Sequence, residues 1–220
     1  MPPTTVHLLR HGEVHNPGRV LYGRLPEFHL SELGQKMAQR AADYFADRVA
    51  HGANICYLVS SPLTRAQETA QPTAAALNLE IVTDDRIIEA ENRFEGLADI
   101  RRQLRDPRHW ASLRNPMRPS WGEAYTAQVL RVMAAAEDAR KAAEEIGGPG
   151  AEAIMVSHQL PIWVTRLAAE RRRLWHDPRR RQCTLASVTS LKFDGEHLAG
   201  VEYCEPSADL LPGAANLPGA

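Results

Sequence analysis

The chain has 220 residues and a formal net charge of −1, from 26 basic and 27 acidic side chains. This length can bury the core of one α/β domain or of two small domains. The near-neutral charge argues against general attraction to nucleic acid or to an anionic membrane, and no apolar run is long enough to cross a bilayer. Because the start of the chain lacks a basic segment followed by an apolar stretch, we expect a cytoplasmic protein.

Strand-like apolar runs alternate with helical patterns along most of the chain. This alternation predicts an α/β fold: a three-layer α/β/α sandwich with a mostly parallel sheet and helices on both faces. The expected strands are 6–10, 55–60, 79–82, 153–157, 184–193 and 197–203, the last two joined by a hairpin turn. The expected helices are 31–48, one with Pro62 at its first position, one that follows Glu123 and ends at about 146, and 160–169.

We expect residues 1–205 to form a single domain. The segment from about 84 to 121 is rich in proline and tryptophan and has little periodicity, which predicts a cap-like insertion over a site. Residues 206–220 are expected to be a flexible tail.

Cysteines and other possible metal ligands have no informative spacing. Cys56, Cys183 and Cys204 are odd in number and include no Cys-x-x-Cys pair, so neither a disulfide framework nor a zinc site is supported. No grouping of His, Asp and Glu has metal spacing. We therefore expect metal-independent chemistry without a cofactor.

The first predicted strand delivers Arg10, His11 and Gly12 to the point where its apolar pattern stops. Arginine offers a planar fork of donors suited to phosphate oxygens, and histidine can be a nucleophile near neutral pH. Gly12 removes a side chain that would block the approach of a ligand to the backbone. The triplet therefore indicates a phosphoryl-transfer site in which the histidine is itself phosphorylated.

Two further segments place suitable residues after predicted strands. Arg65 lies in the first turn of the helix after the second strand, and His158 directly follows the strand at 153–157. Ligands of open α/β sheets bind at the carboxyl ends of parallel strands. Arg10, Arg65 and His158 are therefore expected to surround a phosphoryl group carried by His11.

These segments, taken in order, resemble the histidine phosphatase superfamily, in its phosphoglycerate mutase-like branch. The resemblance extends from about Val6 to Tyr203 and rests on 10–13, 60–70, 87–89, 94–96 and 156–159. It implies that His11 is the nucleophile, that Arg10, Arg65 and His158 bind the phosphoryl group, and that Glu89 is the general acid. Glu91 competes with Glu89, because the spacing to the Phe-Glu-Gly segment is one residue short.

Other substrate-binding candidates depend on the same resemblance. Asn16 is similar to an asparagine that contacts phosphate, and Gly23 is placed to close over the leaving group, although both also suit ordinary turns. Two positions depart from the pattern. Val14 stands where a hydroxyl residue is usual, and Gln159 stands where glycine often follows the histidine, so that a side chain points near the pocket.

The function indicated is hydrolysis of a small phosphorylated metabolite through a phosphohistidine on His11. Phosphoglycerate mutase activity is the alternative, and an inactive scaffold that binds phosphorylated ligands is a distant one. Mutases of the family have an Arg-His-Tyr-Gly continuation after the acid and a later lysine, whereas Glu89 is followed here by Ala-Glu-Asn-Arg and no lysine lies between Lys36 and Lys141. The expected partner is a small phosphorylated substrate, with no nucleic acid or membrane, and a homodimer is left open.

Overall fold

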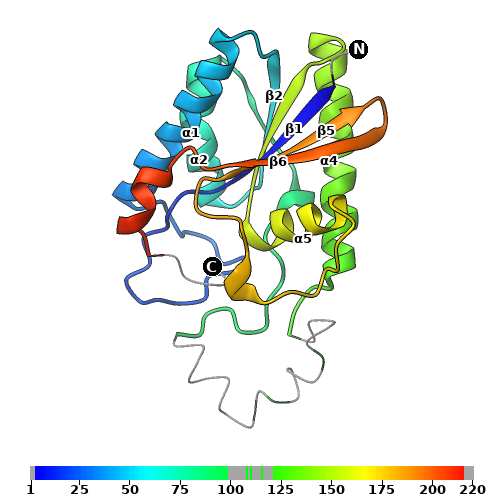
Figure 1. The fold of residues 1–220 in the computed structure, drawn as a ribbon. Helices are drawn as coiled ribbons and strands as arrows, with labels where there is room; N and C mark the ends of the chain where they lie inside the picture. Colours follow the sequence, from blue (N-terminus) through cyan, green and yellow to red (C-terminus); the bar gives the residue numbers. More distant parts are fainter. Residues whose placement is uncertain (1–2, 99–107, 109, 111–114, 116–120, 216–220) are drawn as a thin grey trace.

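A mixed six-stranded sheet forms the middle of the computed structural model, which describes residues 3–98, 108, 110, 115 and 121–215 (Figure 1). The spatial strand order is β3-β2-β4-β1-β5-β6. The strands are β1 (Thr4–Arg10), β2 (Ile55–Ser60), β3 (Ile81–Thr83), β4 (Glu152–Ser157), β5 (Val188–Asp194) and β6 (His197–Cys204). β4 pairs in parallel with both β1 and β2, so the carboxyl ends of these three strands meet at one edge.

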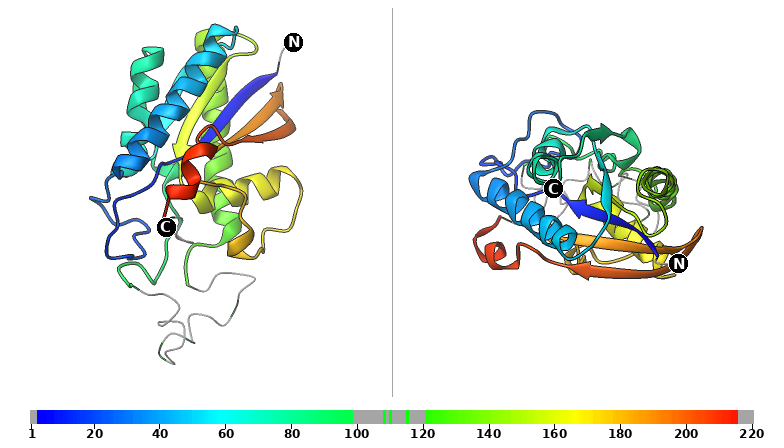
Figure 2. Two further views of the ribbon diagram at one scale, coloured as in Figure 1. Left: turned by 60° about the vertical axis from the view of Figure 1, so that its left-hand side comes forward. Right: turned by 90° about the horizontal axis from the view of Figure 1, so that it is seen from above.

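Four longer helices cover the two faces of the sheet, with α1 and α2 on one side and α4 and α5 on the other (Figure 2). Their bounds are α1 Glu32–Ala50, α2 Thr64–Leu77, α4 Tyr125–Gly147 and α5 Gln159–Ala169. Short 3-10 helices span Asp85–Ile87, Pro178–Arg180 and Ala208–Gly213. The predicted three-layer α/β/α architecture is confirmed.

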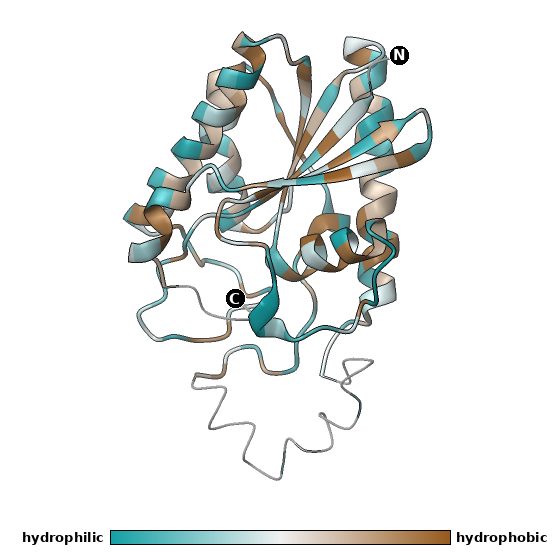
Figure 3. Cartoon of the chain, in the orientation of Figure 1, coloured by the Kyte–Doolittle hydropathy of each residue, from teal (hydrophilic) through white to brown (hydrophobic). Residues whose placement is uncertain are grey.

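Successive residues of β1 point to opposite faces, which divides the apolar core into two layers. Leu8 belongs to the cluster under α4 and α5, and its neighbour Leu9 belongs to the cluster under α1 and α2. Both side chains are fully buried. Figure 3 shows apolar residues along the strands of the central sheet.

Several predicted boundaries were wrong by two residues or more; among them, the strand expected at 79–82 is β3 at Ile81–Thr83. The strand expected from Thr184 begins at Val188, because residues 184–187 form a turn in which the Ser187 amide donates to the Thr184 carbonyl and Ala186 has a φ of 51°. The helix expected to have Pro62 at its first position begins at Thr64.

The segment after Pro206 is packed in its described part, in contrast to the flexible tail that we expected. Its 3-10 helix places Leu210 and Leu211 against a buried cluster that contains Met37 and Leu185, and the Ala215 amide donates to the Glu13 carboxylate at 2.6 Å. Residues 216–220, and half of the expected cap-like insertion, lie outside the described residues. No helix in the part of the chain that the structure describes is long and apolar enough to cross a membrane.

Candidate active site

The carboxyl ends of β1, β2 and β4 bring His11, Ser61 and His158 together. The sheet pairing continues one residue beyond each strand, because the His11 amide donates to the Ser157 carbonyl at 3.1 Å and the Ser61 amide donates to the Val156 carbonyl at 2.9 Å. The rings of His11 and His158 lie 5.2 Å apart between centroids. Topology alone therefore makes neighbours of residues that are almost 150 positions apart in the chain.

His11 is completely buried and held in one orientation. Its Nδ1 lies 2.8 Å from the Gly12 carbonyl oxygen, which can only accept, so the ring proton is on Nδ1. The Nε2 atom is then an unprotonated lone-pair nitrogen, and it has no hydrogen-bond partner among the described residues. Burial, followed by the charges of Arg65 and Arg10, holds the pKa of His11 well below its ordinary value, which keeps this nitrogen available as a nucleophile.

The turn after His11 fits closely against the start of α1. A Cβ atom on Gly12 would lie 2.6 Å from the Gly34 carbonyl oxygen, and one on Gly34 would lie 2.0 Å from the Glu13 carbonyl oxygen. The Gly12 amide also donates to the Thr69 hydroxyl of α2 at 3.1 Å. These contacts fix the backbone on which His11 sits.

Arg10 and Arg65 are both 1 % exposed and act electrostatically on both histidines. Arg10 donates from Nη1 to the Cys183 carbonyl at 2.7 Å. The guanidinium of Arg65 stacks over the Tyr22 ring at 4.7 Å and donates from Nη2 to the Gly23 carbonyl. Two buried guanidinium groups beside an unprotonated nitrogen form an environment that favours a doubly charged phosphoryl group.

His158 joins the same cluster from the end of β4. Its Nε2 lies 2.8 Å from the Ser61 hydroxyl, and its Nδ1 is buried without a hydrogen-bond partner among the described residues. Burial and then Arg65 lower its pKa well below the ordinary value. Ser61 was not predicted as a site residue, although its position directly after a parallel strand could have identified it by the reasoning used for Arg65.

Glu89 and Glu91 occupy different surroundings. Glu89 is 6 % exposed and its Oε1 accepts the Ala90 amide at 2.8 Å. Burial raises the pKa of Glu89, while the nearby charges of Arg65, Arg181 and Arg10 oppose that rise. The side chain of Glu91 is 69 % exposed and pairs with Arg24 at 2.9 Å. Of the two carboxyl groups, only Glu89 is thus buried beside the arginine pair.

The loop that carries Glu89 is fastened to α4 by Arg131, which sequence reasoning did not identify. Arg131 donates from Nη1 to the carbonyls of Arg86 and Ile88 at 2.6 and 2.7 Å. It also pairs with Glu123 at 2.8 Å. A guanidinium offers five donors in a fixed plane, so one side chain can hold three chain segments together.

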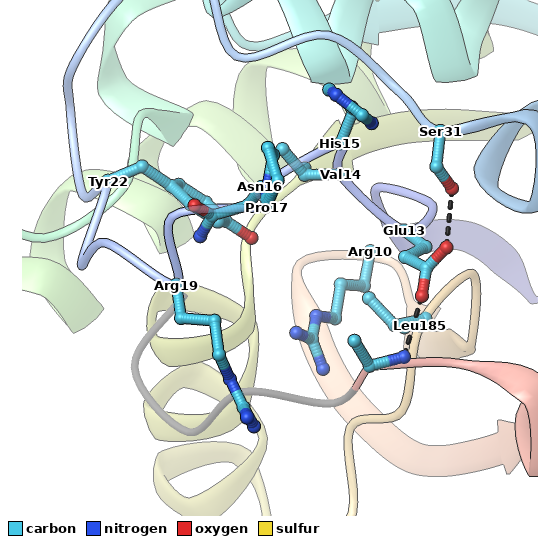
Figure 4. Close-up of a pocket in the computed structure, with 11 residues that line it drawn as sticks. Arg10, Glu13, Val14, His15, Asn16, Pro17, Arg19, Tyr22, Ser31 and Leu185 are labelled. Carbon is cyan, nitrogen blue, oxygen red and sulfur yellow. Dashed lines mark hydrogen bonds between the residues drawn. The ribbon is translucent and has the colours of Figure 1, made fainter. Parts of the chain in front are cut away.

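Asn16 and Gly23 lie on the loop between β1 and α1. Both ends of the Asn16 amide bond to the Val20 backbone, at 2.8 and 3.0 Å, so Asn16 closes its own turn. Gly23 has a φ of 38°, in the left-handed region that favours glycine, and a Cβ atom there would lie 2.2 Å from Oε1 of the Glu95 side chain. Figure 4 shows Arg10, Asn16, Val14 and Tyr22 on the wall of one cavity of about 230 Å³.

Val14 stands at the position where a hydroxyl residue is usual. Its side chain packs against Tyr22 and Phe28, so the residue has a structural role there.

A second cavity is lined by Glu89 and Gly23. Its wall also includes Gln159 and Arg181. Gln159 donates to the Cys183 carbonyl at 3.3 Å and accepts from Arg181 Nη1 at 3.2 Å. The remaining lining residues are Ala90, Glu91, Asn92, Trp121, Gly122, Glu123, Tyr125 and Leu160.

Among the residues that the structure describes, no group of three or more His, Cys, Asp or Glu side chains is arranged to hold a metal ion. Positive charge at the site comes from the arginines.

Comparison with known proteins shows the family of the chain. The profile of the histidine phosphatase superfamily (branch 1) matches residues 6–205. The chain belongs to this superfamily. Among relatives, the uncharacterized protein Rv0525 of Mycobacterium tuberculosis is 51 % identical over 207 residues, which cover 93 % of this chain and 98 % of that protein. Phosphoserine phosphatase 1 of Hydrogenobacter thermophilus is 30 % identical over 161 residues, covering 70 % of this chain and 71 % of its own.

The fold of this histidine phosphatase superfamily member is also found in solved structures. The mycobacterial glucosyl-3-phosphoglycerate phosphatase Rv2419c superposes with a TM-score of 0.70 at 24 % identity, over 91 % of this chain and 95 % of that one. At this level of identity the likeness concerns the fold. It agrees with the six-stranded α/β sandwich described above.

Proposed function

We propose that this protein is a phosphatase that hydrolyses a small phosphomonoester through a phosphohistidine on His11. The observation that carries the proposal is the buried, unprotonated Nε2 of His11, fixed by the Nδ1 contact to Gly12 and surrounded by Arg10, Arg65 and His158. A related protein, 30 % identical, is named as a phosphoserine phosphatase, which supports hydrolysis as the reaction.

In the first step, the lone pair of His11 Nε2 attacks phosphorus and the bond from phosphorus to the ester oxygen breaks. Glu89 supplies the proton that the departing alkoxide takes up. Its raised pKa, caused by burial, favours the protonated form that this task requires. Arg10, Arg65 and His158 stabilise the charge on the three phosphoryl oxygens in the transition state.

In the second step, water attacks the phosphohistidine, and the Glu89 carboxylate takes up its proton. The phosphorus–nitrogen bond breaks, Nε2 regains its lone pair and inorganic phosphate leaves. Each group thus returns to its starting state, and no co-reactant other than water is needed.

The test is a panel of phosphorylated metabolites offered to the purified protein, with and without added 2,3-bisphosphoglycerate. We expect stoichiometric release of inorganic phosphate that does not depend on the bisphosphate and is absent in a His11→Ala variant. Isomerisation of 3-phosphoglycerate without phosphate release would identify a mutase instead. Equal phosphate release by wild type and His11→Ala would show that His11 is not the nucleophile.

A further inference from the structure

Arg181 places a cationic group on the wall of the Glu89-lined cavity without a carboxylate bonded to it. Its two hydrogen bonds within the described part of the chain go to neutral partners, Gln159 Oε1 at 3.2 Å and His176 Nε2 at 2.9 Å. A guanidinium has five N–H donors, so three of them have no protein partner there. Arg181 is half-buried, and burial lowers its pKa.

The orientation of Arg181 is fixed from both sides. His176 Nδ1 lies 2.7 Å from the Leu174 carbonyl oxygen and must donate to it, so Nε2 is the acceptor that receives the Arg181 Nε proton. Gln159 is held in turn by the Cys183 carbonyl, the same oxygen that receives Arg10 Nη1. Gln159, which stands where glycine often follows the histidine, thus links Arg181 to the backbone that also binds Arg10.

Among the residues that line the cavity, Arg181 is a cation with no ion pair to a carboxylate in the described part of the chain. Glu91 pairs with Arg24, and Glu123 pairs with both Arg24 and Arg131. Glu89 is needed in its protonated form when the leaving group departs. A half-buried guanidinium whose hydrogen-bond partners are neutral gains from pairing with an incoming anion. Because three carboxyl groups also line the cavity, a singly charged anion fits better there than a second phosphate.

We propose that Arg181 binds a carboxylate on the alcohol part of the substrate, which makes phosphomonoesters of small hydroxy acids the substrate class. This inference rests on the proposed phosphatase function, in which the leaving alcohol lies beside Glu89. The cavity has a volume of about 60 Å³, which holds roughly four water-sized groups and therefore suits a short carboxylated chain.

A matched pair of substrates tests the inference. 3-Phosphoglycerate and sn-glycerol 3-phosphate share a three-carbon skeleton and a primary phosphate ester, and differ in a carboxylate against a hydroxymethyl group. Both leave as primary alkoxides and need Glu89 equally, so any effect of Arg181 on Glu89 cancels in the ratio of their kcat/KM values. A charge-assisted hydrogen bond predicts a wild-type ratio of about tenfold to a hundredfold in favour of 3-phosphoglycerate.

The variant Arg181→Gln should bring this ratio to within about threefold of unity, and Arg181→Lys, which keeps the charge but not the fork, should give an intermediate ratio. Arg179→Gln is the matched control, because Arg179 belongs to the same arginine run but is 81 % exposed and pairs with Asp177. Its ratio should equal that of wild type.

Binding provides a measurement that does not depend on turnover. In a His11→Ala background, calorimetric titration should show 3-phosphoglycerate binding more tightly than sn-glycerol 3-phosphate, and the added Arg181→Gln change should remove the difference. A wild-type enzyme that hydrolyses p-nitrophenyl phosphate but has a ratio near unity would overturn the inference and leave the phosphatase function standing. If no ester is hydrolysed, the phosphatase function fails, and equal affinities in the His11→Ala protein would refute the role of Arg181 as well.

Discussion

Two glutamates separated by one residue show how far the surroundings of a side chain decide its chemistry. Burial raises the pKa of Glu89, whereas Glu91 is exposed and bonded to Arg24. A general acid must hold its proton near the working pH, and burial beside the reacting atoms achieves this. The chain pattern could not separate the two residues, since their spacing to the next motif is irregular, but the three-dimensional geometry favours Glu89.

We predict that Glu89→Gln slows hydrolysis of alkyl phosphates by a factor of about 100 or more, because an alkoxide needs a proton to leave. The same variant should still be phosphorylated rapidly by p-nitrophenyl phosphate, whose phenolate leaves without help. Stopped-flow detection of the p-nitrophenolate burst separates the two steps. Glu91→Gln is the matched control and should behave as wild type. A leaving-group dependence in Glu91→Gln alone would reassign the acid.

The contact between Gln159 and Arg181 could not be predicted from the sequence. Arg10, His11, Arg65 and His158 could be predicted because each lies at or just after the carboxyl end of a strand. Arg181 belongs to a run of three arginines, and nothing in that run distinguishes it from the exposed Arg179. Its role becomes visible only when the loop after α5 folds back toward Gln159.

At the scale of elements, the 3.6-residue pattern and the strand-end signals predicted the order of helices and strands along the chain. They did not predict how the loops between those elements are fastened. Arg131 is an example, because it lies in the second turn of α4 and binds the backbone of the Glu89 loop. Such contacts join segments more than 40 positions apart and leave no local pattern.

We predict that Arg131→Lys lowers kcat for alkyl phosphates by about tenfold to a hundredfold, because a lysine ammonium cannot hold both carbonyls and Glu123 in one plane, and small displacements of catalytic groups cost this much. Phosphorylation by p-nitrophenyl phosphate should change far less, which marks Arg131 as a positioning residue for Glu89. Arg140→Lys, further along α4 and paired with Glu137 and Glu144, is the control. Equal loss with both esters would mean a general structural role instead.

The contact between the His11 turn and α1 gives a second prediction for this scale. Gly34→Ala should destabilise the protein by about 1–3 kcal/mol, since the new Cβ would meet the Glu13 carbonyl oxygen at 2.0 Å and the backbone must shift. Helix propensity alone would predict stabilisation. Urea unfolding decides between the two signs. Gly200→Ala, where a Cβ meets nothing within 4 Å, should leave stability nearly unchanged.

For the whole molecule, three buried histidines couple stability to pH. Burial lowers the pKa of His7, His11 and His158, whereas in the unfolded chain each has an ordinary value near 6.5. As pH falls below 6.5, these histidines become protonated in the unfolded chain but stay neutral in the folded protein. The free energy of unfolding therefore decreases. The raised pKa of Glu89 acts in the opposite direction, but it is a single group.

We therefore predict that stability falls between pH 7 and pH 5, by up to about 1.4 kcal/mol per pH unit for each of the three histidines. Urea titrations at three pH values measure this slope, and a His11→Gln variant should show a shallower one. Stability that stays constant or rises as the pH is lowered to 5 would contradict the account of these buried rings.

The three-layer architecture follows from the alternation of strands and helices, which is a property of the whole chain. The packing of the segment after Pro206 does not, because Leu210 and Leu211 are too few to form a periodic pattern, yet they pack against the buried cluster that contains Met37. Packing between residues that are far apart in the sequence is set by the folded structure and leaves no local sequence pattern.

The most direct test of the whole account is to trap the covalent intermediate. The protein would be mixed with a rapidly reacting phosphate ester, quenched in alkali within milliseconds, and digested for mass spectrometry. We predict one phosphoryl group on His11, stable to alkali and lost in acid, that disappears as inorganic phosphate forms and is absent in His11→Ala. Phosphate release in a burst that leaves no label on His11, or a label on another residue, would contradict the central claim.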